Sequence, residues 1–249
     1  MADMDTALSP ELSAFRDEVR SFIAANLPDD LRRAARRTPS VFHDPDVSLP
    51  WQRILNARGW AAPDWPVEFG GPGWDAVQRY IFISECVAAD APHLAPMGLK
   101  MVAPVLMHYG TPQQQAYYLP RILSGQDLWA QGYSEPGAGS DLQSIRAIAR
   151  TSAGGYELSA SKTYVTNGGK ATLYLTLARH PQTDQAARPR FGLFLVERLR
   201  PGVSQTSTFE KTAFGLVDTV QLEMDAVQLG RDDLLGGEEG RGFGQLMEA

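Results

Sequence analysis

The apolar residues in the first half of the chain recur at helical spacing. The first stripe consists of Leu12, Phe15, Val19, Phe22 and Ile23. Ser9 and Pro10 precede it, and these are residue types that cap and begin a helix. Similar patterns predict helices over residues 50–58, 75–89 and 96–109 and a further helix from Pro112, which Thr111 caps. Residues 9–125 are therefore expected to be mainly helical.

After Gly125 the pattern changes to short runs with alternating or β-branched and aromatic residues, separated by Gly, Asn and Pro. The predicted strands are 128–134, 145–151, 155–159, 162–166, 172–179, 191–196 and 219–224. About seven short strands at this spacing predict a small antiparallel barrel or sandwich. The fold class is therefore α+β, with helices first and strands second.

These two patterns divide the chain. We expect an N-terminal helical domain over residues 1–125 and a middle β-domain over residues 126–236. A glycine-rich turn at 236–242 then leads into an apolar helical stripe that begins at Phe243, so residues 237–249 are expected to start a further helical domain.

Composition narrows the class of protein. The 249 residues carry 23 Lys and Arg against 29 Asp and Glu, a net charge of −6, which argues against nonspecific nucleic-acid binding and against docking to an anionic membrane. A single cysteine, Cys86, excludes an intrachain disulfide, and the four histidines lack metal-ligand spacing. No signal segment or membrane span is evident in the sequence, so we expect a cytoplasmic enzyme or binding protein without a metal.

The most informative segment is residues 129–142, W-A-Q-G-Y-S-E-P-G-A-G-S-D-L. A predicted strand ends at Ser134, and a turn rich in Pro and Gly then presents backbone N–H groups beside the hydroxyls of Ser134 and Ser140. Small residues there let a flat or anionic ligand approach the backbone. The segment lacks the residues of a phosphate-binding P-loop or a dinucleotide fingerprint. An ordinary β-turn is the alternative interpretation.

A second segment, residues 162–170, reads K-T-Y-V-T-N-G-G-K, and its Asn167-Gly168 pair alone would favour a β-hairpin. Together, in this order and spacing, the two segments resemble the acyl-CoA dehydrogenase family of flavoenzymes. The resemblance extends to W-P-V-E-F-G-G at 65–71, to residues 110–120, to 191–196 and to 236–243.

The resemblance implies FAD as cofactor and assigns roles to residues of both segments. Gln131, Tyr133 and Ser134 are expected to line the flavin, with the Ser134 hydroxyl near the hydride-accepting N5 atom. Gly139 and Ser140 are expected at the flavin pyrophosphate or the acyl-CoA entrance. Glu135 and Asp141 are instead expected to be structural, Asp141 as a cap and Glu135 in a salt bridge at the surface or between subunits.

Three further residues receive roles from the resemblance. Tyr164 takes the position of an aromatic residue that packs on the flavin face opposite the substrate, and Thr166 that of a hydrogen-bonding group at the pyrimidine edge. Met101 lies in a helix that borders the acyl pocket in the family, so it is a candidate for substrate contact.

The implied reaction is FAD-dependent α,β-dehydrogenation of an acyl-CoA thioester, with electron-transfer flavoprotein as electron acceptor and a homo- or hetero-oligomer as the assembly. The family's catalytic base lies in a C-terminal four-helix domain, which would begin near Phe243, so we expect the base beyond Ala249 and little or no activity from residues 1–249 alone. Two alternatives stay open. One is a non-catalytic subunit that completes an active site in trans, and the other is a flavin oxidase or monooxygenase of the same fold.

Overall fold

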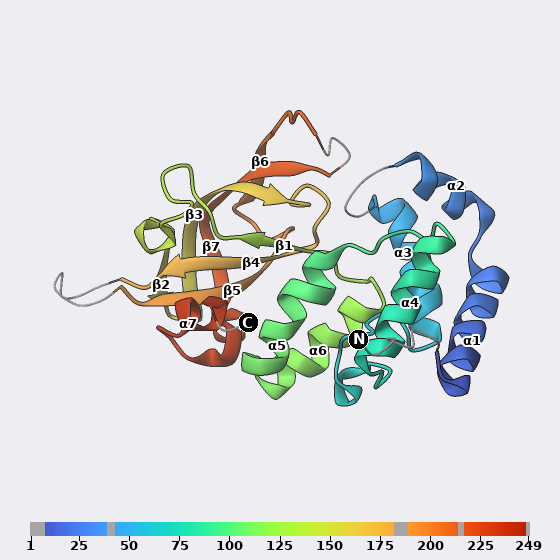
Figure 1. The fold of residues 1–249 in the computed structure, drawn as a ribbon. Helices are drawn as coiled ribbons and strands as arrows, with labels where there is room; N and C mark the ends of the chain where they lie inside the picture. The colour runs from blue at the N-terminus through green and yellow to red at the C-terminus, as the bar shows by residue number, and fades with distance from the viewer. Residues whose placement is uncertain (1–7, 39–42, 182–188, 214–216, 248–249) are drawn as a thin grey trace, which may run out of the picture. The chain divides into compact units, whose positions relative to one another are not determined.

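The computed structural model describes residues 8–38, 43–181, 189–213 and 217–247. The chain falls into two compact units, Met1–Leu94 and Ala95–Ala249 (Figure 1). The second unit therefore includes helices that precede the sheet in sequence, while the domain limits at residues 125 and 236 stay predictions. Within the described residues, no helix combines the length and apolar character needed to cross a bilayer.

The first unit is helical, as predicted. Its elements are α1 (Pro10–Asn26), α2 (Asp29–Arg37), α3 (Pro45–Ala57), the short η1 (Val67–Phe69) and α4 (Ala76–Ala88). Ser9 caps α1 by accepting a hydrogen bond from the Leu12 N–H, and α1 buries Val19 and Ile23 against α4. Trp60, Trp74 and Phe82 pack together with ring centroids 5.1–6.0 Å apart and close this core.

Helix α3 begins at Pro45, five residues before the predicted start at Pro50. Asp44 caps it, and Pro50 lies inside the helix rather than at its first turn. The buried face continues on both sides of this proline through Ser48, Trp51 and Leu55. Burial of that face compensates for the one backbone hydrogen bond that a proline removes.

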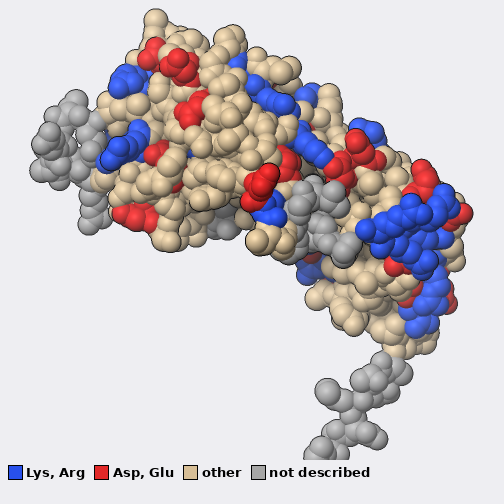
Figure 2. Space-filling model, turned by 90° about the horizontal axis from the view of Figure 1, so that it is seen from above, with Lys and Arg blue, Asp and Glu red and all other residues tan. Residues whose placement is uncertain are grey.

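Helix α2 carries four arginines. Figure 2 shows Lys and Arg side chains gathered on the surface of the helical part of the chain. Arg33, Arg36 and Arg37 are exposed, and Arg32 is half-buried. Arg32 pairs with Asp29 and Arg36 with Asp90, so part of the positive charge is neutralised locally. This face of α2 is therefore largely exposed to solvent.

The second unit begins with η2 (Met97–Val102), a π-helical segment that continues into α5 (Ala103–Tyr109), and with α6 (Pro112–Leu123). Thr111 and Gln114 form a reciprocal capping box at the start of α6. The helix predicted over residues 96–109 is therefore present but changes its hydrogen-bonding pattern partway.

Seven strands follow in the part of the chain that the structure describes. They are β1 (Trp129–Gly132), β2 (Ile148–Ser152), β3 (Gly155–Thr166), β4 (Leu173–Arg179), β5 (Phe191–Glu197), β6 (Val203–Thr208) and β7 (Thr219–Gly230). Their order is β1-β4-β2-β3-β7-β6, and β5 pairs with β4. The α+β class is confirmed, but the sheet is mixed, because β1 runs parallel to β4. The 40-residue connection that contains β2 and β3 is long enough for such a crossover.

Three details of the strands differ from what the sequence pattern suggests. The runs 155–159 and 162–166 form the single strand β3, and β6 was not predicted because its residues, V-S-Q-T-S-T, are mostly polar and exposed. The β-hairpin that the Asn167-Gly168 pair alone would favour does not form, because β3 pairs with β2 and β7 and not with β4. Asn167 adopts a φ of +59° and turns the chain out of β3 towards β4 instead.

The chain after β7 packs on the sheet through η4 (Arg231–Asp233), η5 (Leu235–Gly237) and α7 (Gly242–Met247). The Phe243 ring lies 5.6 Å from the Phe191 ring of β5, and Gly242 approaches the backbone of Gly192. The helical stripe predicted from Phe243 is thus present and contacts this chain's own sheet.

Candidate functional site

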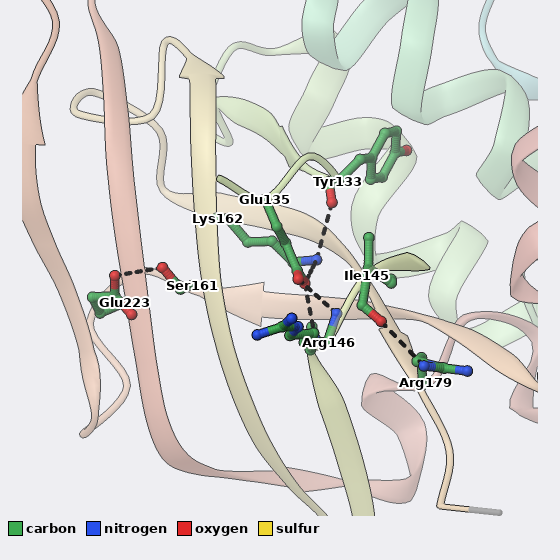
Figure 3. Close-up of polar contacts among 9 residues, drawn as sticks. Tyr133, Glu135, Ile145, Arg146, Ser161, Lys162, Arg179 and Glu223 are labelled. Atoms are coloured by element: carbon green, nitrogen blue, oxygen red, sulfur yellow. Dashed lines mark hydrogen bonds and ion pairs between the residues drawn. The ribbon is translucent and has the colours of Figure 1, made fainter. Parts of the chain in front are cut away.

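The two sequence segments singled out above meet in space. The Thr163 N–H donates to the Ser134 carbonyl oxygen at 2.9 Å, and the Lys162 ammonium donates to the Tyr133 carbonyl oxygen at 3.0 Å. Figure 3 shows the segment after β1 lying against β3 at this point. Residues about 30 positions apart in sequence therefore form one surface.

A β-bulge shapes β3 beside this contact. Lys162 pairs with Leu222 and Val165 with Val220, so β3 contains one more residue than β7 between these two pairs. Tyr164 occupies the bulge with a φ of +55°, a conformation that costs energy for a side chain of this size. Its side chain is 66% exposed, and its ring lies 4.9 Å from the Phe209 ring. The fold thus presents an aromatic face to solvent at a strained position.

A pocket of about 160 Å³ opens at the bulge. It is lined by Met97, Gln131, Tyr133, Ser134, Thr163, Tyr164 and Thr166. Five of the seven predicted cofactor-binding residues are among these: Gln131, Tyr133, Ser134, Tyr164 and Thr166. None of the lining residues is charged, and they combine aromatic rings with hydroxyl and amide groups. This chemistry suits an uncharged planar ring with polar edges.

The structure does not bring the other predicted residues to this pocket. Gly139 and Ser140 are exposed in the turn after Ala138, outside the lining. Met101 is 44% exposed on η2, and Met97 from the same element lines the pocket in its place. The roles of Gly139, Ser140 and Met101 stay predictions.

Tyr133 has a defined hydrogen-bonding arrangement in the pocket. The Gln131 side-chain amide donates to the Tyr133 hydroxyl oxygen at 3.2 Å. Burial raises the pKa of the Tyr133 phenol, because the ionised form would lose its hydration. The phenol therefore stays neutral and serves as an uncharged hydrogen-bonding group.

Glu135 was expected to form a salt bridge at the surface or between subunits, and this location is wrong. Glu135 forms a salt bridge, but with Lys162 of the same chain at 2.9 Å, and the two side chains are 8% and 0% exposed (Figure 3). Burial lowers the pKa of the Lys162 ammonium, and the adjacent carboxylate opposes that effect. Asp141 begins η3 (Leu142–Ser144) as expected, but its carboxylate accepts from the Ser144 hydroxyl rather than from a backbone N–H.

A signal for this buried pair was present in the sequence. Tyr156, Leu158 and Ala160 alternate along β3 and are buried, and Lys162 continues the same series. A lysine on the inward face of a strand requires a buried partner, because an unpaired buried charge is costly.

A larger hollow, of about 780 Å³, lies next to the same turn and takes Glu135, Pro136, Gly137 and Ala138 into its lining. The Ser161 hydroxyl, also in this lining, donates to the Glu223 carboxylate at 2.6 Å (Figure 3). The segment from Tyr133 to Ala138 therefore borders two hollows, of which only the smaller is free of charged residues.

Comparison with known families identifies the family of this chain. The acyl-CoA dehydrogenase N-terminal domain matches residues 9–126, and the acyl-CoA dehydrogenase middle domain matches residues 130–227. The chain belongs to the acyl-CoA dehydrogenase family, whose members are flavoprotein oxidoreductases.

Individual relatives are similar over most of this chain. Acyl-CoA dehydrogenase IpdE1 of Mycobacterium tuberculosis is 34% identical over 200 residues, which cover 78% of this chain and 51% of the relative. The ChsE4-ChsE5 complex from Mycobacterium tuberculosis matches 98% of this chain and 61% of the matched chain, with 28% identity and a TM-score of 0.78. The Tcur3481-Tcur3483 steroid acyl-CoA dehydrogenase (ACAD) matches 99% of this chain and 62% of that chain, with 28% identity and a TM-score of 0.77. The chain spans about half the length of the curated relatives it matches.

Proposed function

We propose that this chain forms the flavin-binding wall of an FAD-dependent acyl-CoA dehydrogenase, which oxidises the α,β carbon–carbon bond of an acyl-CoA thioester. The observation that carries the proposal is the convergence of the 131–134 and 163–166 segments on one uncharged pocket beside the exposed Tyr164 ring. The family membership supports the reaction class.

The residues present fit the isoalloxazine ring of FAD. Tyr164 offers a ring for stacking, and aromatic contacts of this kind contribute about 1 kcal/mol beyond burial of area. The Ser134 and Thr166 hydroxyls lie in the same lining, where they can bond to polar edge atoms. When bound, FAD accepts the hydride from the substrate β-carbon. The pocket is too small for the whole cofactor, so the pyrophosphate and adenine need other contacts, for which Gly139 and Ser140 stay candidates.

The proton on the substrate α-carbon requires a base, and the pocket lining contains no carboxylate or histidine. Glu135 is close in sequence, but its carboxylate is committed to Lys162 and to two backbone N–H groups. We therefore propose that the base comes from a part of the family's fold outside this lining.

Assembly and acceptor are part of the same proposal. Two of the similar structures carry names that pair two gene products, ChsE4-ChsE5 and Tcur3481-Tcur3483. This favours an oligomer, including one in which a second subunit completes the site. Electron-transfer flavoprotein is the acceptor that we propose. The steroid dehydrogenase among these structures favours a bulky acyl group as the class of substrate.

Titration of the full chain with FAD, followed by flavin fluorescence, tests the proposal. The Tyr164→Ala variant is expected to bind FAD about tenfold more weakly than the unmodified chain, because the stacking face is lost. Tyr80→Ala is the matched control, since Tyr80 is 72% exposed in the first unit. Equal affinity of Tyr164→Ala and the unmodified chain, or no binding at about 1 mM FAD, would contradict the proposal.

A further inference from the structure

We infer that Lys162 and Glu135 are positioning residues, which hold the Ser134 hydroxyl in register with the Tyr164 bulge. Neither side chain is in the lining of the smaller pocket, so the pair acts on the pocket through the backbone between them. The expected effect of the pair on FAD binding rests on the proposed function. Its effect on the backbone around Ser134 does not depend on that proposal.

Three consecutive residues are tied to β3 at this point. The Tyr133 carbonyl accepts from the Lys162 ammonium at 3.0 Å, the Ser134 carbonyl accepts from the Thr163 N–H at 2.9 Å, and the Glu135 carboxylate accepts from Lys162 at 2.9 Å. Ser134 is therefore fixed both at its own carbonyl and at both neighbours. The point from which its side chain projects is therefore fixed relative to Thr163 and Tyr164.

The Glu135 carboxylate extends this connection to a third segment. It accepts from the Arg146 N–H at 2.6 Å and from the Ala147 N–H at 2.8 Å, just before β2. The turn itself is closed by two backbone hydrogen bonds between Glu135 and Ala138, of 2.9 and 3.0 Å. One carboxylate thus joins the end of β1, the start of β2 and the middle of β3.

The aliphatic part of the Lys162 side chain is closely packed against β1 and β4. A Cβ on Gly132 would lie 3.5 Å from Cγ of Lys162 and 3.2 Å from the Thr176 hydroxyl oxygen. Buried ion pairs are weak sources of net stability, since neutral replacements of similar volume are often tolerated. In this location the pair fixes the path of the backbone instead, because each of its hydrogen bonds involves Tyr133 or Glu135, the two neighbours of Ser134.

The test compares the unmodified chain with the variant Lys162→Met/Glu135→Gln, which removes both charges and leaves one acceptor for the backbone N–H groups. Ser134→Ala is introduced into each background, and FAD affinity is measured for all four proteins. If the pair acts through Ser134, the serine substitution weakens FAD binding about fivefold in the unmodified chain and less than about twofold without the pair. Equal fold-changes in both backgrounds would overturn the inference. Arg58→Met, which removes an exposed ion pair with Glu18, is the control for loss of a charge.

A second measurement needs no flavin. Amide hydrogen exchange of residues 133–147 is expected to rise about tenfold or more in the Lys162→Met/Glu135→Gln variant, while exchange in α6 stays unchanged. Unchanged exchange in residues 133–147 would refute the geometric inference, whereas absence of FAD binding by the unmodified chain would refute only the proposed function. If that variant does not fold, Lys162→Met alone serves for both measurements, because the Glu135 carboxylate then keeps the Arg146 and Ala147 N–H groups as partners.

Discussion

The side-chain oxygen of Gln114 accepts a hydrogen bond from the Gly236 N–H at 3.0 Å, across 122 residues of sequence. The same side chain accepts from the Thr111 N–H and donates to the Asp232 and Leu234 carbonyls at 2.8 and 2.9 Å. One buried amide therefore completes the cap of α6 and holds the segment that follows β7.

Replacing Gln114 with alanine is expected to lower the free energy of unfolding by about 2–4 kcal/mol, because buried backbone groups at both ends lose their partners. Urea denaturation monitored by tryptophan fluorescence measures the change. Gln113→Ala, at the exposed neighbouring position, is expected to change stability by less than about 0.5 kcal/mol. Similar losses for the two variants would show that the bridge to residues 232–236 contributes nothing.

Gly242 offers a second comparison on one helix. A Cβ there would lie 2.6 Å from the Gly192 carbonyl carbon, so Gly242→Ala should displace α7 from β5 and cost about 1–3 kcal/mol. Gly244→Ala meets nothing within 4 Å and should be neutral or stabilising by up to about 1 kcal/mol. Thermal unfolding of both variants checks this, and an unaffected Gly242→Ala would contradict the close approach.

His180 makes stability depend on pH. Burial lowers the pKa of its imidazole, with a smaller opposing effect of Glu239, and both ring nitrogens lack a hydrogen-bond partner within the described residues. The unfolded chain then binds a proton more readily than the folded chain. The folded chain therefore keeps its full stability above the ordinary histidine pKa and loses stability as the pH falls through that value. The free energy of unfolding decreases by about 1.4 kcal/mol for each unit by which folding lowers the His180 pKa.

The variant His180→Phe removes this titration and keeps a ring between Tyr156 and Phe194. Chemical denaturation at about pH 7.5 and about pH 5.5 should therefore show a smaller loss of stability for the variant than for the unmodified chain. His93, whose pKa is also lowered by burial, accounts for a remaining loss. Parallel pH curves for the two proteins would exclude His180 as a contributor.

Cys86 provides a probe of α4, since it is the chain's single cysteine. Burial raises the pKa of its thiol to about 12, which leaves little thiolate at neutral pH. Reaction with a disulfide reagent at about pH 8 is expected to be at least tenfold slower in the folded chain than in urea. Equal rates would mean that α4 opens freely or that the thiol is accessible.

The sequence predicted the helical elements well where local signals were strong. Ser9, Asp75 and Thr111 all cap helices in the structure, because a cap depends on residues within one turn of the helix end. It predicted α3 less well, since Pro50 reads locally as a helix start and only the buried face on both sides shows that the helix continues. The polar strand β6 had no local signal, because its pairing with β7 alone defines it as a strand.

For the candidate site, sequence similarity selected five residues that line one pocket, and it did so without information on their geometry. The buried Lys162–Glu135 pair was missed, because Glu135 was considered with its turn and Lys162 with its strand. The two side chains are close in space because the crossover brings the end of β1 against β3.

The sequence by itself determined most of the element types, the α+β class and the family, because helical and strand periodicities, caps and motifs are encoded in neighbouring residues. The tertiary structure alone decided the parallel pairing of β1 with β4, the strained bulge at Tyr164 and the burial of Lys162. These features depend on contacts between segments far apart in the chain. Such contacts contribute free energy only when the sheet has formed.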